Sequence, residues 1–77
     1  MNLEIMTPEK TLFKGTATLV QLPGMDGLFE ILDNHAPLIS VLKKGKVKIK
    51  AQREFQYFDI NGGVVEVRKN KTLVLAE

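Results

Sequence analysis

His35 and Ser40 are the side chains that most directly suggest nucleophilic catalysis. They are the only histidine and the only serine of the chain, and they lie five residues apart. A serine nucleophile needs an adjacent base and often sits on a Gly-x-Ser-x-Gly turn, which is absent around Ser40. A zinc site needs three or four ligands at suitable spacing, whereas the chain has one histidine and no cysteine. The sequence therefore predicts no catalytic residue, no metal site and no enzymatic activity.

The loop Gly24-Met25-Asp26-Gly27 invites comparison with phosphate-binding loops. Such loops end in Gly-Lys-Ser/Thr and lead into a helix whose N-terminus faces the phosphate. Here Gly27 is followed by Leu-Phe-Glu-Ile-Leu, which has neither feature. We therefore interpret the segment as a hairpin loop and predict no bound cofactor.

Lysines dominate residues 43–50, whose sequence is Lys-Lys-Gly-Lys-Val-Lys-Ile-Lys. Three of them alternate with apolar residues, which predicts one solvated face of a strand. The alternative is a small basic β-barrel that binds single-stranded nucleic acid, with Phe55 and Tyr57 stacking on bases beside the lysines. Two rings make a thin stacking platform, so we expect no nucleic-acid partner and keep this function as the alternative.

Apolar and polar residues alternate with a period of two along most of the chain, which predicts an all-β fold. The stretch from Phe29 to Leu42 is the best competing helix, but Pro37 and the β-branched residues after it argue against one. Asn61-Gly62-Gly63 predicts a tight hairpin, and Lys69-Asn70-Lys71 a further turn. The predicted strands are 2–6, 16–22, 45–51, 55–60, 64–68 and 72–75.

Length and composition limit the possible functions further. Seventy-seven residues make one domain, and the absence of cysteine excludes a disulfide framework and fits a reducing cytosol. The net charge of +2 is far from that of a nucleic-acid-binding tail. Apolar runs are only a few residues long and no signal peptide is evident, so we expect any membrane association to occur through another protein.

Six fragments follow one another along the chain: Thr7-Pro8-Glu9-Lys10, Val20 to Gly27, His35-Ala36-Pro37-Leu38, Phe58 to Gly63, Val65-Glu66-Val67 and Val74 to Glu77. Together they resemble the epsilon subunit of F-type ATP synthases, and their order and spacing are more specific than any one of them. The resemblance implies a flattened β-sandwich of two roughly five-stranded sheets, with residues 1–77 forming a single domain of this type.

The function that this resemblance implies is that of a non-catalytic rotor subunit in the central stalk. Such a subunit links the gamma subunit to the membrane c ring and couples proton translocation to ATP synthesis, with the catalytic alpha/beta head an indirect partner. Its implied location is peripheral, on the cytoplasmic face of the bacterial plasma membrane, as part of the complex.

The resemblance also implies two contact surfaces. The implied gamma interface is His35, Ala36, Pro37, Leu38, Ile39 and Leu42, although a plain turn remains the alternative for the His35 segment. The implied ring-facing loop is Gly24, Met25, Asp26, Gly27 and Leu28. Leu28 departs from the family pattern, which often has an acidic residue at this position.

The chain ends at Glu77, where family members commonly continue into a C-terminal pair of helices. We therefore expect a short form that consists of the β-sandwich alone, without a C-terminal helical hairpin. The regulatory brake and the nucleotide binding associated with that hairpin are not carried over to this chain.

Overall fold

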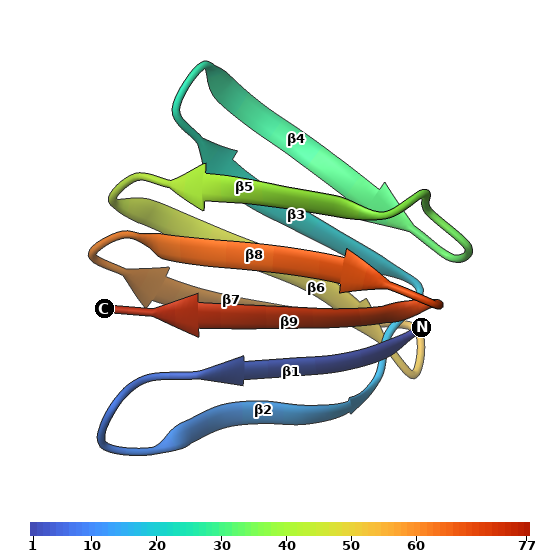
Figure 1. The fold of residues 1–77 in the computed structure, drawn as a ribbon. Coiled ribbons are helices and arrows are strands. Elements are labelled where there is room, and N and C mark those ends of the chain that lie inside the picture. The colour runs from blue at the N-terminus through green and yellow to red at the C-terminus, as the bar shows by residue number, and fades with distance from the viewer.

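A computed structural model describes all 77 residues and contains nine strands and no helix, which confirms the predicted all-β class (Figure 1). The connections between strands are short turns and loops, as expected where turn-forming residues separate alternating segments. The strands are β1 (Asn2–Met6), β2 (Thr11–Thr16), β3 (Leu19–Gly24), β4 (Gly27–Leu32), β5 (Leu38–Leu42), β6 (Gly45–Ala51), β7 (Glu54–Ile60), β8 (Gly63–Arg68) and β9 (Lys71–Ala76).

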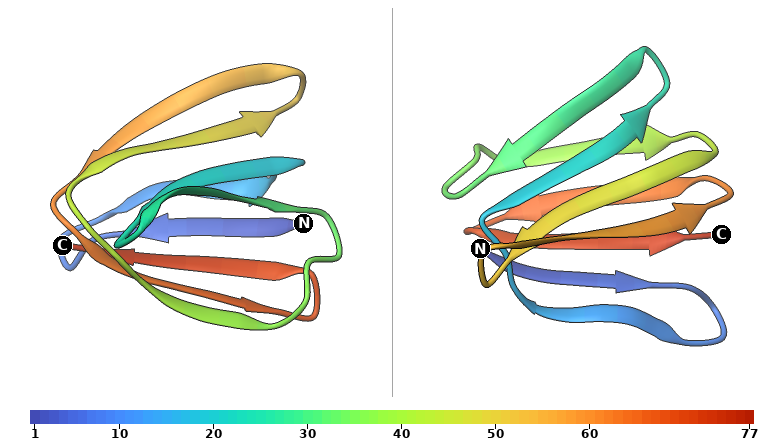
Figure 2. Two further views of the ribbon diagram at one scale, coloured as in Figure 1. Left: turned by 90° about the horizontal axis from the view of Figure 1, so that it is seen from above. Right: turned by 180° about the vertical axis from the view of Figure 1, so that it is seen from behind.

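Hydrogen bonding arranges the strands in two layers that meet at one point (Figure 2). The first layer has the order β2-β1-β9-β8-β5, and the second has the order β4-β3-β6-β7. Their one shared residue pair is Gly24 of β3 with Leu42 of β5. The fold is therefore the predicted β-sandwich, with five strands in one layer and four in the other.

A single cluster of 16 buried hydrophobic residues fills the space between the layers. Ile5 and Val74 reach it from the five-stranded layer, and Val47 and Ile49 reach it from the four-stranded layer. Full burial of one such side chain contributes about 1.5–3 kcal/mol, so these alternate positions fix the register of the strands. Between the terminal strands β2 and β7, the partly buried rings of Phe13 and Phe58 pack with their centroids 6.3 Å apart.

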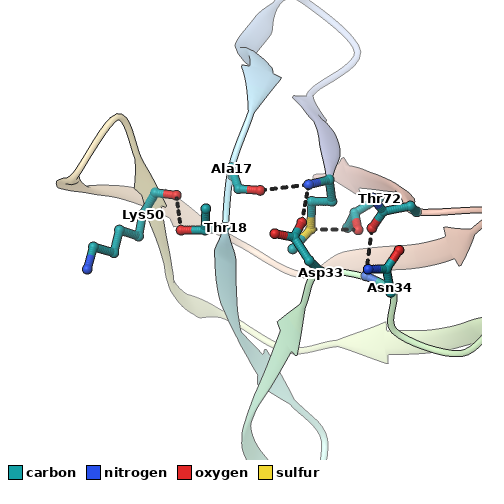
Figure 3. Close-up of polar contacts among 8 residues, drawn as sticks. Ala17, Thr18, Asp33, Asn34, Lys50 and Thr72 are labelled. Atoms are coloured by element: carbon teal, nitrogen blue, oxygen red, sulfur yellow. Dashed lines mark hydrogen bonds and ion pairs between the residues drawn. The ribbon is translucent and has the colours of Figure 1, made fainter.

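The predicted strand 16–22 is wrong in its first half, because Ala17 and Thr18 carry the chain from one layer to the other. The N–H of Ala17 donates to the Met1 carbonyl at 3.0 Å, whereas that of Thr18 donates to the Lys50 carbonyl at 2.9 Å. Figure 3 shows two further contacts of these residues, from the Met1 ammonium group to the Ala17 carbonyl and from the Thr18 hydroxyl to the Lys50 carbonyl. The alternation shifts phase at the crossing, because the buried residues Ala17 and Val20 are three positions apart, and this shift accompanies the change of layer.

The predicted hairpin at Asn61-Gly62-Gly63 is also wrong, because this segment connects two layers. It leads from β7, which pairs only with β6, to β8, which pairs with β5 and β9. The predicted positive backbone angles are present, with φ of 135° at Gly62 and 146° at Gly63. The predicted turn at Lys69-Asn70-Lys71 is present as the tight β8–β9 hairpin, where Lys69 and Asn70 have φ of 51° and 57°.

The start of β1 is anchored by polar contacts from three other segments (Figure 3). The Met1 ammonium group donates to the Ala17 carbonyl at 2.9 Å and pairs with the Asp33 carboxylate. The thioether sulfur of Met1 accepts a hydrogen bond from the buried Thr72 hydroxyl at 3.2 Å. These contacts join β1 to the β2–β3 crossing, to the β4–β5 connection and to β9.

Replacement of Gly63 by alanine should lower the free energy of unfolding by at least about 3 kcal/mol. A Cβ at Gly63 would lie 2.2 Å from the Leu75 carbonyl oxygen, so the backbone of β9 would have to move in addition to the strain at positive φ. Gly27→Ala is the matched control, because Gly27 has φ of 127° but nothing within 4 Å of its added Cβ. The control should lose about 1–2 kcal/mol. Equal urea midpoints for the two variants, followed by circular dichroism, would show that the contact with β9 adds no cost at Gly63.

Candidate interaction surfaces

The two predicted contact segments lie at opposite ends of β4. Met25 and Asp26 join β3 to β4, and residues 33–37 join β4 to β5. In Figure 1 these two connections are at the left and right ends of the sandwich. A six-residue strand therefore separates the ring-facing loop from the His35 turn.

The His35 turn is held by hydrogen bonds within the connection. The His35 N–H donates to the Leu32 carbonyl at 3.3 Å, and Asn34 has a positive φ of 63°. The His35 ring places Nδ1 2.7 Å from the Ala36 carbonyl oxygen, so Nδ1 carries the proton in this arrangement. The ring thus stiffens the approach to Pro37 and leaves Nε2 for other partners.

Asn70, in the β8–β9 turn, was not among the predicted site residues, yet it fixes the His35 turn in place. Its side-chain Oδ1 accepts the N–H of Asn34 at 2.7 Å, and its carbonyl oxygen accepts the N–H of Asn2 at 3.1 Å. One residue therefore connects the start of β1, the β4–β5 connection and the β8–β9 hairpin. The sequence marks Asn70 as a turn residue but carries no sign of its distant partner.

One predicted interface residue is misplaced. Leu42 is only 3% exposed and belongs to the core, so its assignment to an exposed contact is wrong. Leu38 is partly buried and packs against the same core. Ile39, by contrast, is 72% exposed, and the neighbouring outward position on β5 is Val41, at 57%.

An apolar stripe continues from Ile39 across the outer face of the five-stranded layer. Val41 pairs with Val64 of β8, which pairs with Leu75 of β9, so these side chains share one face of the sheet. All of them are at least 38% exposed. Sequence reasoning missed three of its members, which the strand register alone brings together. We call Ile39, Val41, Val64 and Leu75 the outer stripe.

The predicted ring-facing loop is centred on the two-residue β3–β4 connection, Met25 and Asp26, and exposes apolar side chains. Met25 is 61% exposed and Leu28 is 66% exposed. Gly24 is buried, and a Cβ there would lie 2.8 Å from the Phe29 ring, so this glycine permits packing and offers no contact surface. Asp26 supplies the one carboxylate of the loop, and it forms no ion pair within the chain.

The lysine-rich strand β6 has its apolar side chains in the core and its lysines on the outer face of the four-stranded layer, as predicted. Lys46 pairs with Asp59 at 2.8 Å. The ammonium groups of Lys48 and Lys50 lie over the ring of Phe55, 5.0 and 5.4 Å from its centroid.

No three His, Cys, Asp or Glu side chains converge closely enough to hold a metal ion. The chain contains no helix with the length and apolarity that a membrane crossing requires. The structure therefore offers surfaces and loops as its candidate functional features.

Comparison with known proteins identifies similar chains and folds. The family model of the ATP synthase delta/epsilon chain β-sandwich domain matches residues 1–77. The ATP synthase epsilon chain of Chlorobium limicola is 46% identical over 76 residues, which cover 97% of this chain and 86% of that relative. The epsilon chain of Caulobacter vibrioides is 39% identical, with 100% of this chain and 90% of that relative covered.

A solved mitochondrial ATP synthase from Euglena gracilis, described as its OSCP, F1 and c-ring assembly, contains a chain with the same fold. The TM-score is 0.92, with 99% of this chain and 49% of that chain covered. At 13% identity, this similarity concerns the fold alone.

Removal of the Asn70 side chain should loosen the His35 turn without breaking the β8–β9 hairpin. Asn70→Gly keeps access to positive φ but loses the acceptor for Asn34, so hydrogen exchange at the Asn34 amide should accelerate by about tenfold, for a bond worth about 0.5–1.5 kcal/mol. Asn70→Asp keeps an acceptor oxygen and should retain the protection. Unchanged exchange at Asn34 in the glycine variant, measured by NMR, would show that this contact does not hold the turn.

Proposed function

This chain belongs to the ATP synthase delta/epsilon chain family, and we propose that it acts as a rotor subunit that links the gamma subunit to the c ring. The family consists of non-catalytic subunits, so the proposed role depends on binding and mechanical connection. The observation that carries the proposal is the family match, which extends over residues 1–77. We infer that these residues act as one domain.

The proposed gamma-binding surface is the His35 turn together with the outer stripe. Ala36 and Pro37 are exposed at the turn, and Ile39 follows directly at the start of β5. A contiguous apolar surface on a small protein is typical of a protein–protein contact. Support also comes from the rigidity of the turn, because a contact surface held by hydrogen bonds loses little conformational entropy on binding.

The proposed ring-binding surface is the exposed part of the β3–β4 loop. Met25 offers a flexible apolar contact, and Asp26 offers a carboxylate to a basic loop of the ring. Leu28, where an acidic residue is common in the family, would make this contact more apolar and less dependent on salt. The buried Gly24 contributes by shaping the loop.

In this role the sandwich transmits torque between its two ends. Proton flow turns the ring, the β3–β4 loop moves with it, and the His35 turn and outer stripe carry the movement to gamma and indirectly to the alpha/beta head. A closely packed core suits this purpose, because close-packed protein interiors resist compression and transmit strain. The location that follows is the cytoplasmic face of the bacterial plasma membrane, within the complex.

The alternative is the binding of single-stranded nucleic acid by the lysine-rich face. Phe55 lies under two ammonium groups, which leaves Tyr57, 58% exposed, as the better placed ring for base stacking. One available ring is a poor platform for a strand of several nucleotides. We therefore favour the rotor role.

Ile39→Asp should weaken binding to the gamma subunit of the same complex by at least about tenfold, or about 1.4 kcal/mol. The side chain is already exposed, so the substitution places a charge in the proposed interface and leaves the core intact. Phe55→Asp is the matched control, because Phe55 is 51% exposed on the other layer. Equal affinities for the wild type and the Ile39 variant by calorimetry would reject the proposed surface.

Asp26→Lys should lower the fraction of the chain that associates with membranes containing the c ring and gamma. Charge reversal at the loop should cost about threefold in affinity at low salt, and the loss should shrink as salt increases. Glu9→Lys, in the exposed β1–β2 connection at the same end of the sandwich, makes the same charge change outside the loop and should have little effect. A comparable loss with both variants in co-sedimentation would point to net charge and away from a specific loop contact.

A further inference from the structure

Five of the eleven basic residues of the chain lie within eight consecutive positions. Two are in the β5–β6 connection, and three are on the outer face of β6. This face belongs to the four-stranded layer, so it lies on the opposite side of the sandwich from the outer stripe. We call these residues the lysine track: Lys43, Lys44, Lys46, Lys48 and Lys50.

A groove of about 430 Å³ runs beside the track. Four of the five lysines line it, together with the Tyr57 and Leu28 side chains, and none of its lining residues is acidic. Gly45 forms part of it, and a Cβ at Gly45 would lie 2.8 Å from the Pro23 side chain. The close approach of β6 to β3 at this point therefore depends on a glycine.

The carboxylates near the track leave most of its charge unpaired. The cross-strand neighbour of Lys46 is Asp59, and these two form an ion pair at 2.8 Å. The cross-strand neighbour of Lys48 is Tyr57, and that of Lys50 is Phe55. Glu30 on β4, the nearest acidic position across β3, accepts a hydrogen bond from Gln21.

Lys48 and Lys50 are therefore held by an aromatic ring and have no carboxylate partner. Their ammonium groups lie 5.0 and 5.4 Å from the centroid of Phe55. An exposed cation–π contact is worth about 0.5–1 kcal/mol, which positions the two charges without neutralising them.

We propose that the lysine track binds an extended acidic segment of another protein. The lysines of β6 repeat every second residue, which is about 6.6–6.8 Å along a strand. Alternate side chains of an extended peptide have the same repeat, so aspartate or glutamate at every second position would match Lys46, Lys48 and Lys50 in turn. The backbone of such a peptide would lie along the groove, beside Tyr57 and Leu28.

This spacing favours an acidic peptide over the other polyanions. A nucleic acid strand would use the aromatic rings for stacking, and the ring of Phe55 is already contacted by two ammonium groups. The inference goes beyond the proposed rotor function, because its lysines lie on the opposite face of the sandwich from the proposed gamma-binding stripe and outside the β3–β4 loop. Its groove shares Gly27 and Leu28 with that loop, so the test variants are confined to the lysines.

The test is a fluorescence-anisotropy titration of the chain against a labelled peptide of about ten residues that alternates glutamate with threonine. We expect saturable binding at about 50 mM salt that weakens by about tenfold at about 200 mM salt. The Lys48→Glu, Lys50→Glu double variant should bind at least about tenfold more weakly. Lys10→Glu with Lys14→Glu, two exposed lysines outside the track, is the charge-matched control and should change the affinity less than about twofold.

Three results would overturn the proposal. One is no binding of the alternating peptide at low salt, and another is an equal loss of affinity in the track and control variants. The third is tighter binding to an oligothymidine or to phosphatidylglycerol vesicles than to the peptide, which would assign the track to a different polyanion. Circular dichroism of each variant verifies the fold, and a second track variant, Lys43→Glu with Lys44→Glu, replaces the first if that one is unfolded.

Discussion

Contact between the two layers through aliphatic side chains at alternate positions is the constraint on which the rest of this structure depends. A chain of this length buries only about 60–65% of its unfolded surface, so few apolar residues can be spared from the core. A shift of one residue in any strand would turn its whole set of core side chains outward. Burial of the core side chains therefore fixes the strand register, and the outward-facing positions remain available for other roles.

Those outward positions differ strongly between the two layers. The five-stranded layer presents the apolar outer stripe, and the four-stranded layer presents the lysine track. The ends of the sandwich differ as well, since one end presents the β3–β4 loop and the other the His35 turn. A domain with one core can thus offer several chemically distinct surfaces, because each strand contributes one side chain inward for every one outward.

The sequence predicted the fold best where alternation, charge and turn residues agree. In β6 the predicted bounds, Gly45 to Ala51, match the observed strand, because lysine and aliphatic side chains separate its two faces. Prediction failed at Ala17 and Thr18, because the phase shift between Ala17 and Val20 interrupts the alternation without showing which strands will pair. At Gly62 and Gly63 the backbone angles were predicted, but their use in a layer crossing depends on which strands pair, and that is decided by distant contacts. Leu42 was misassigned because its burial depends on its pairing with Gly24 of the other layer, a contact that the local sequence does not show.

The pairing of β1 with β9 is the one parallel pairing in the molecule, and it joins strands from opposite ends of the described chain. The β1–β2 hairpin reaches the rest of its layer only through β9, because β1 lies between β2 and β9. During synthesis, the five-stranded layer cannot be completed until β9 has left the ribosome. Until then the β1–β2 hairpin lacks its neighbouring strand, and its apolar side chains remain exposed. Contacts between residues so far apart in sequence slow folding, so we expect the five-stranded layer to form late, after translation of β9.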